Sequence, residues 1–284
     1  MTLTPSLHAL RVLGRADRDA ALELLARDPV AHVFVASRIL HGSSAARWSI
    51  GGELWGWVED GELRSMCFAG ANLVPVEATP AALAAFVERG RRQGRHCSSI
   101  VGPAGDVLAL WGGLAISWSP AREVRRSQPL MAITGEPVIE ADPRVRPVRP
   151  QELDVVLPAS IAMFTEEVGV SPLVGDGGGL YRNRVAELID GGRSFAWIED
   201  GTVVFKAELG AVSDVAVQVQ GVWVDPNRRG QGLAAPCMAA VVQWAQDQFA
   251  STVSLYVNDY NVAARRAYLR TGFRDVGTFA TVLF

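Results

Sequence analysis

Residues 222–236 read VWVDPNRRGQGLAAP, in which an apolar strand runs through a glycine loop directly into a helix. Glycines at 230 and 232 let the backbone approach an anion closely, and the helix N-terminus adds unpaired amides and the positive end of its dipole. Pro236 is tolerated only in a first helical turn, so we expect the helix to begin near Gly232. The stretch therefore predicts a site for a pyrophosphate group. The expected contacts are the two arginines and the loop amides, namely Arg228, Arg229, Gly230, Gln231, Gly232, Leu233 and Ala234.

The sequence around this stretch alternates between strand and helix patterns. In chain order we expect a strand at 145–150, helices near 150–167 and 180–190, strands at about 193–199, 201–210 and 215–224, a helix near 232–247, a strand at 252–257, a helix at 262–271 and strands to the C-terminus. Gly221 interrupts the third of these central strands and predicts a β-bulge there. The β-α-α-β-β-β-α-β-α-β order predicts an α/β fold with a mixed sheet covered by helices.

A second motif lies downstream at 261–273 and reads NVAARRAYLRTGF. Together with the glycine loop it resembles the GNAT N-acetyltransferase family, whose cofactor loop reads Q/R-x-x-G-x-G/A and whose later stretch reads N-x-x-A-x-x-x-Y-x-x-x-G-F. Both motifs stand in the family's order and spacing, and the resemblance covers about 140–284. The whole chain is further similar to two-domain actinobacterial GNAT proteins with an uncharacterised N-terminal domain. The residues that fill the two patterns are Arg229, Gly232, Ala234, Asn261, Ala264, Tyr268, Gly272 and Phe273.

The resemblance implies that acetyl-coenzyme A is the cofactor and that its acetyl group passes directly to a primary amine of a small molecule, peptide or protein. It also implies that Asn261 binds cofactor amides and that Tyr268 protonates the leaving thiolate. Each residue also has a structural interpretation, because Asn261 can cap its helix and Tyr268 can pack in the core. The pantetheine arm is expected beside a strand end opened by a bulge, at Val222, Trp223 and Val224.

The base that accepts the amine proton is a carboxylate whose position varies within the family. Glu166 and Glu167 are candidates, because they lie at the end of the helix where the family's acceptor site opens. Two acids at a helix C-terminus interact unfavourably with the helix dipole, which indicates that they have another function such as accepting a proton. A solvated helix end explains them as well. Weaker candidates are Glu208, Asp214, Gln218, Gln220 and the C-terminal carboxylate of Phe284.

An internal repeat predicts that the chain has two similar halves. Residues 56–63 (GWVEDGEL) and 196–203 (AWIEDGTV) share Trp-x-Glu-Asp-Gly at an offset of 140 residues, and each predicts a β-hairpin with a tight Asp-Gly turn. Prolines at 137, 143, 147 and 150 mark the boundary between the halves. With the family resemblance, this implies a tandem GNAT-like acyl-CoA N-acyltransferase fold with its catalytic copy at the C-terminus. We expect a degenerate domain over 1–135, a proline-rich linker and first strand over 136–150, and an acetyltransferase domain over 144–284.

The first half lacks the residues that would bind a pyrophosphate. It repeats the hairpin at 53–68, a strand near 72–77 and a helix at 80–93, but the loop VPVEATPAAL before this helix has neither a glycine pair nor an arginine. Trp111 takes roughly the place of Tyr268. We expect this half to shape the acceptor site or an interface, or alternatively to bind a separate ligand.

Composition excludes several classes of protein. The 284 residues carry 27 basic and 30 acidic side chains, so the net charge of −3 predicts no nucleic-acid partner. No run of about 18 apolar residues and no targeting segment is found, which predicts a cytoplasmic protein without a membrane partner. Three cysteines without CxxC spacing, and four histidines that all precede residue 97, predict neither disulfides nor a metal site, and leave the second half without an imidazole base.

The resulting hypothesis is an acetyl-CoA-dependent N-acetyltransferase that is a monomer or a homodimer. Two different hypotheses stay open, namely a module that binds or senses acyl-CoA without turnover, and an acyl or aminoacyl transferase with another donor. Lys206 is the only lysine of the chain, and the excess of arginine is interpreted as a composition bias without a functional role.

Overall fold

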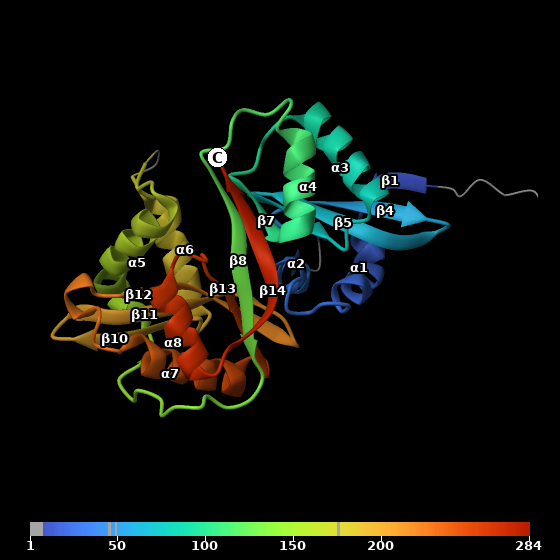
Figure 1. The fold of residues 1–284 in the computed structure, drawn as a ribbon. Coiled ribbons are helices and arrows are strands. Elements are labelled where there is room, and N and C mark those ends of the chain that lie inside the picture. The colour runs from blue at the N-terminus through green and yellow to red at the C-terminus, as the bar shows by residue number, and fades with distance from the viewer. Residues whose placement is uncertain (1–7, 45–46, 49, 175–176) are drawn as a thin grey trace, which may run out of the picture. The chain divides into compact units, whose positions relative to one another are not determined.

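The structure is a computed structural model that describes residues 8–44, 47–48, 50–174 and 177–284. The sequence also predicts a glycine-rich connection, GDGGG, at 175–179 between two helices, and its first two residues lie outside the described ranges. It divides the chain into two compact units (Figure 1). The first unit holds residues 1–130, 256–260 and 275–284, and the second holds residues 131–255 and 261–274.

The two halves of the chain have the same order of elements, which confirms the tandem α/β fold. In the first half the order is β1 (His8–Val12), α1 (Arg18–Leu25), α2 (Val33–His41), β4 (Gly52–Glu59), β5 (Glu62–Gly70), β6 (Asn72–Val76), α3 (Pro80–Gln93), β7 (Ser99–Pro103), α4 (Ala104–Leu114) and β8 (Glu123–Ile133). In the second half it is β9 (Arg146–Pro147), α5 (Leu153–Val168), α6 (Gly179–Asp190), β10 (Ser194–Glu199), β11 (Thr202–Val212), β12 (Ala216–Val224), α7 (Ala234–Gln248), β13 (Thr252–Tyr256), α8 (Val262–Thr271) and β14 (Arg274–Leu283). A short pair, β2 (Ser43–Ser44) and β3 (Arg47–Trp48), and three 3-10 turns at 15–17, 150–152 and 226–228 complete the described elements.

The repeated hairpins adopt the same turn in both halves. Asp60 and Gly61 have φ angles of 50° and 85°, and Asp200 and Gly201 have φ angles of 49° and 74°. Two consecutive positive φ angles are what a two-residue hairpin turn with the right twist requires, and Asp-Gly adopts them readily. Each hairpin carries the same one-residue register shift, after Trp57 and after Trp197.

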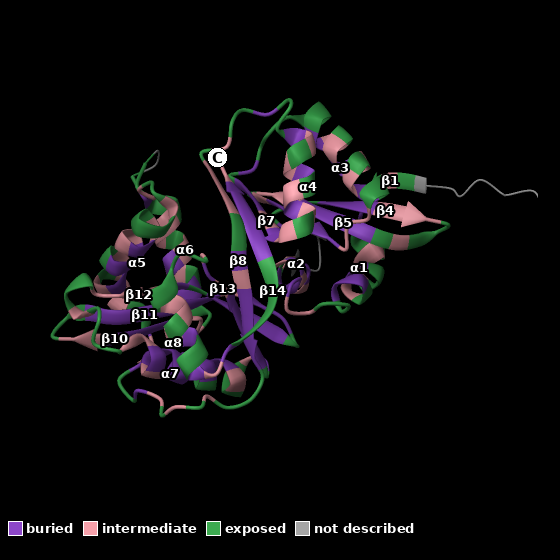
Figure 2. Cartoon of the chain, in the orientation of Figure 1, coloured by how far each residue is buried: buried purple, intermediate pink, exposed green. Residues whose placement is uncertain are grey.

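The sheet of the first unit is covered on both faces. Its strands follow the order β1-β4-β5-β6-β7-β14-β8. Alternate residues of one strand enter different cores, since Leu54 packs in a cluster with α1 and α2, whereas its neighbour Trp55 packs in a cluster with α3 and α4. Figure 2 shows that the strands carry most of the buried residues, while the helices alternate between buried and exposed positions.

The last strand departs from the predicted domain boundaries. The sequence predicts that residues up to 284 belong to the second domain, yet β14 pairs antiparallel with β7 and belongs to the first unit from Asp275 onward. Ala280 and Val282 are fully buried in the same apolar cluster as α3 and α4. The physical reason is that β7 would otherwise present an open edge of unpaired backbone groups, which β14 covers. The predicted linker at 136–150 lies wholly in the second unit.

The second unit has the strand order β13-β12-β11-β10-β9. Helices α5 and α6 pack in one apolar cluster with β10 and β11, and α7 is buried along most of one side. The helices begin and end within three residues of the expected positions. No described helix is both long enough and apolar enough to cross a membrane.

Candidate functional site

An opening between two parallel strands forms one side of the site in the second unit. β12 and β13 pair only over residues 216–218 and 252–254, and β12 then continues to Val224 beside β11 alone. Gly221 has a φ angle of +61°, and the register against β11 shifts between Lys206 and Glu208, directly opposite it. The predicted bulge is therefore present, and the backbone of residues 222–224 continues past the end of the ladder with β13.

The glycine loop leaves the start of α7 without a cap. Gly230 and Gly232 both adopt left-handed φ angles, of +77° and +78°, and α7 begins two residues later with Pro236 in its first turn. The side chain of Leu233 at the N-cap accepts no hydrogen bond. The backbone amides of residues 230–234 donate to no residue that the structure describes. A helix start of this kind presents several donors and a positive dipole end to an anion.

Three arginines lie at or near this loop, and they differ in what they bind. Arg229 donates through Nε to the Val224 carbonyl at 3.0 Å and through Nη2 to Glu166 at 2.8 Å. Arg228 pairs with Glu199 at 2.9 Å. Arg270 from α8 is not among the residues predicted from the sequence, and its Nη1 lies 3.9 Å from the position that a Cβ on Gly232 would take. Its signal in the sequence is its place two residues after Tyr268 in the second motif.

Glu166 is held in place on both of its oxygens. Oε2 accepts from Arg229, and Oε1 accepts from Trp223 Nε1 at 3.3 Å. The carboxylate thus joins the end of α5 to the end of β12 and to the glycine loop. This role explains an acid at the unfavourable end of a helix without assigning it the amine proton.

The negative charge of Glu167 acts on the phenol of Tyr268. Tyr268 is 6% exposed on α8, and its ring lies 6.0 Å from that of Phe273. Burial raises the pKa of Tyr268 above its usual value of 10, and the negative charge of Glu167 raises it further. The phenol is therefore protonated at neutral pH and can donate a proton.

Asn261 caps α8, because its Oδ1 accepts from the Ala264 amide at 3.1 Å.

A buried ion pair lies beneath the bulge. Lys206 is fully buried and donates to Glu208 at 2.5 Å and to the Gly221 carbonyl at 3.3 Å. Glu208 is 4% exposed. Ser194 on β10 is the cross-strand neighbour of Glu208, and its hydroxyl is buried without a hydrogen-bond partner among the described residues. Two buried charges are costly unless they are paired and hydrogen-bonded, so this pair fixes the bulged strand in one arrangement. The single lysine of the chain therefore stabilises the bulge, a role that composition alone did not indicate.

Among the weaker candidates for the base, Glu208 and Gln220 are cross-strand neighbours on β11 and β12. Asp214 and Gln220 are exposed, and Gln218 is buried on β12. Phe284 belongs to the first unit, where its ring packs against Trp111.

In the first unit, the helix that corresponds to α7 is α3, and its N-terminus is capped. Thr79 caps α3 by accepting from the Ala82 amide at 3.2 Å, and its own amide donates to Ser65 Oγ at 3.2 Å. The Ala78 amide faces Asp106 at 3.4 Å. Donors that are free in the second unit are thus already bound here, and a carboxylate stands where an anion would have to approach.

Two family models match this chain. Residues 174–273 match the acetyltransferase (GNAT) family, and residues 52–156 match a domain of unknown function (DUF4081). An uncharacterized N-acetyltransferase from Mycobacterium tuberculosis is 38% identical over 79 residues, which are 28% of this chain and 51% of the relative. The chain thus spans about half the length of the curated relatives it matches.

Solved structures are similar to the chain over nearly its full length. A GCN5-related N-acetyltransferase from Sphaerobacter thermophilus has a TM-score of 0.59 at 16% identity and covers 96% of this chain and 94% of its own. A tandem GNAT protein from the clavulanic acid biosynthesis pathway has a TM-score of 0.53 at 12% identity and covers 98% of both chains. At these identities the similarity establishes the fold.

Proposed function

Because the second half of the chain carries a domain of the acetyltransferase (GNAT) family, we propose that this protein is an acetyl-CoA-dependent N-acetyltransferase that acts on a primary amine. The observation that supports this best is the uncapped start of α7, whose amides at 230–234 are unpaired beside the gap between β12 and β13. The corresponding helix of the first unit is capped by its own Thr79, so the proposed cofactor site lies in the second unit alone.

The residues around the loop fit a pyrophosphate-bearing cofactor. The amides of the loop and the guanidinium of Arg270 would hold the pyrophosphate, and the backbone of residues 222–224 would hold the pantetheine arm. Bound acetyl-CoA would supply an acetyl thioester, which is the activated group of the reaction. Arg229 stays engaged with Glu166 and the Val224 carbonyl, so we assign it to positioning the loop.

We assign the proton transfers to two side chains at this end of the unit. Tyr268 is protonated at neutral pH and would donate to the departing thiolate. Glu167 is exposed at the end of α5 and acts electrostatically on Tyr268, so we propose it as the carboxylate that accepts the amine proton, in place of Glu166. We place the reaction in the cytoplasm, since all three cysteines are free and buried.

Release of free thiol from acetyl-CoA, measured against a panel of small amines and peptide N-termini, tests this proposal. Tyr268→Phe keeps the packed ring and removes the donor, so we expect turnover to fall by about 10²–10⁴-fold with the melting temperature unchanged. Tyr260→Phe alters a tyrosine that is 66% exposed and serves as the matched control. If coenzyme A binds tightly but no acceptor in the panel increases thiol release above background, the protein is a module that binds acyl-CoA without turnover and the proposed activity is wrong.

A further inference from the structure

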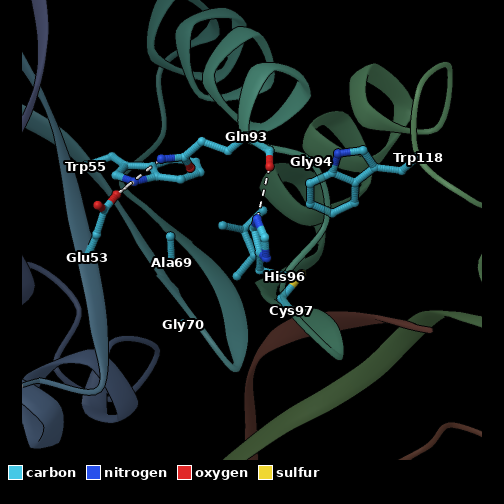
Figure 3. A pocket seen from close by; sticks show the side chains of 10 residues that line it. Glu53, Trp55, Ala69, Gly70, Gln93, Gly94, His96, Cys97 and Trp118 are labelled. Carbon is cyan, nitrogen blue, oxygen red and sulfur yellow. Dashed lines mark hydrogen bonds between the residues drawn. The ribbon is translucent and has the colours of Figure 1, made fainter.

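A cavity of about 370 Å³ lies within the first unit, in the region that matches the domain of unknown function. Its walls come from the start of β4, the end of β5, the end of α3 and the segment after α4. Figure 3 shows Trp55 and Trp118 at opposite sides of the cavity, with Ala69 below them and the end of α3 above. The volume suits a small organic molecule.

The N–H groups of the two indoles that line this space are already hydrogen-bonded. Trp55 Nε1 donates to Glu53 at 2.8 Å, and Trp118 Nε1 donates to the Gly90 carbonyl at 3.2 Å. Both tryptophans are fixed by burial, with exposures of 3% and 9%. Rigid aromatic walls whose polar atoms are already bound favour a flat apolar or aromatic body between them.

The polar groups at the rim retain hydrogen-bond acceptors. Glu53 Oε2 accepts from Trp55, Arg89 and Gln93, whereas Glu53 Oε1 has no partner among the described residues. Gln93 Oε1 is also without a partner there. His96 Nε2 lies 3.0 Å from the Gln93 carbonyl, and because a carbonyl only accepts, Nε2 carries a proton and donates it there.

This set of free atoms selects the chemistry of the ligand. Glu53 Oε1 and Gln93 Oε1 can only accept hydrogen bonds, so a carboxylate or phosphate placed on these two atoms would gain no hydrogen bond from them, and the charge of Glu53 is already shared with Arg89 through Oε2. Hydrogen bonds to Trp55 and Arg89 lower the pKa of Glu53, which keeps the carboxylate ionised at neutral pH. An ammonium group supplies three donors and the opposite charge.

We propose that this cavity binds a small aromatic primary amine, with its ring between Trp55 and Trp118 and its ammonium group on Glu53 Oε1. The site lies in the first unit and takes no part in the acetyl transfer proposed for the second. It gives the domain of unknown function a ligand-binding role of its own.

Calorimetry on the full chain at pH 7 tests the site with two probes of similar size and opposite charge, tryptamine and indole-3-propionate. We expect tryptamine to bind saturably and indole-3-propionate not to bind. Glu53→Gln should weaken tryptamine by at least about tenfold, in line with loss of a charged hydrogen bond. The matched control Glu88→Gln changes a glutamate on α3 that is 72% exposed and does not line the cavity, and should leave binding intact.

Ala69→Leu tests the location without disturbing any polar contact of Glu53. Ala69 is the cross-strand neighbour of Glu53, and its side chain enters the cavity (Figure 3), so the larger residue should abolish binding of tryptamine. The proposal is overturned if tryptamine does not bind, if the Glu53→Gln and Ala69→Leu chains bind it as the wild type does, or if indole-3-propionate binds as tightly. Activity of the second unit is not needed for any of these readouts, so the two proposals fail separately.

Discussion

Replacing Gly232 by valine tests whether the glycine loop holds the pyrophosphate. The φ angle of +78° at this position lies in the left-handed region, which costs an L-residue about 1–2 kcal/mol and a β-branched one the upper end of that range. A Cβ at this position would meet only Arg270 Nη1, at 3.9 Å, so crowding contributes little. The substitution therefore strains the loop rather than the core.

This strain converts directly into a loss of affinity. If the loop relaxes to another conformation that is favoured by about 2 kcal/mol, the binding-competent conformation falls to roughly 3% of the population, and the apparent Kd for coenzyme A rises about thirtyfold. Binding of pantetheine, which has no pyrophosphate, should stay within about twofold, because the substitution does not touch residues 222–224.

Gly201→Val provides the matched control, since it has the same kind of backbone angle, +74°, and open space around its Cβ position. It lies in the β10–β11 turn, so it should lower the melting temperature while leaving the calorimetric Kd for coenzyme A unchanged. A folded Gly232→Val chain with wild-type affinity for coenzyme A would show that the pyrophosphate binds elsewhere. An equal loss in Gly201→Val would mean that both changes act through general stability.

Two further predictions concern ion pairs in the second unit. Arg146 donates at 2.8 and 2.6 Å to Glu152 and lowers its pKa from 4.5 to about 2, so Glu152→Gln should cost about 1 kcal/mol at pH 7 after allowance for solvent screening. Because the folded-state pKa is depressed, that difference should vanish in urea titrations as the pH falls from about 4.5 to about 2. Lys206→Met leaves Glu208 buried and unpaired and should cost about 3–5 kcal/mol, most of which the added change Glu208→Gln should restore. A Lys206→Met chain as stable as the wild type in urea would contradict the burial of this pair.

Local signals were sufficient to predict the order of elements in the second half and, in the first half, the hairpin at 53–68, the strand near 72–77 and the helix at 80–93. Asp60-Gly61 and Asp200-Gly201 specify tight turns by their own backbone preferences, and strand and helix periodicities flank them at equal offsets. Gly221 likewise marked its bulge, because a positive φ angle is a property of one residue.

Contacts between residues far apart in the chain could not be predicted in this way. Nothing within β14 specifies that its partner is β7, some 175 residues earlier, since an alternating strand can cover any open edge. Glu166 and Arg229 are 63 residues apart, and their pairing needs the end of α5 to lie beside the loop before α7. The same limit hid the burial of Lys206, which a count of residue types treats as an ordinary surface lysine.

The unpaired amides before α7 also mean that helix stability and cofactor binding should respond in opposite directions to one added charge. Gln231→Glu places a carboxylate at an exposed position beside these amides, and a negative charge at a helix start stabilises it by about 0.3–1 kcal/mol. The same charge, about 6 Å from a pyrophosphate carrying about two negative charges, costs about 1.4 kcal/mol in water, or a tenfold loss of affinity for coenzyme A that shrinks as salt is added. Gln243→Glu makes the same change on the exposed side of α7, away from its start, and should alter neither quantity appreciably. Tighter coenzyme A binding by Gln231→Glu would contradict an anion site at this helix start, because no cationic ligand gains from unpaired amides.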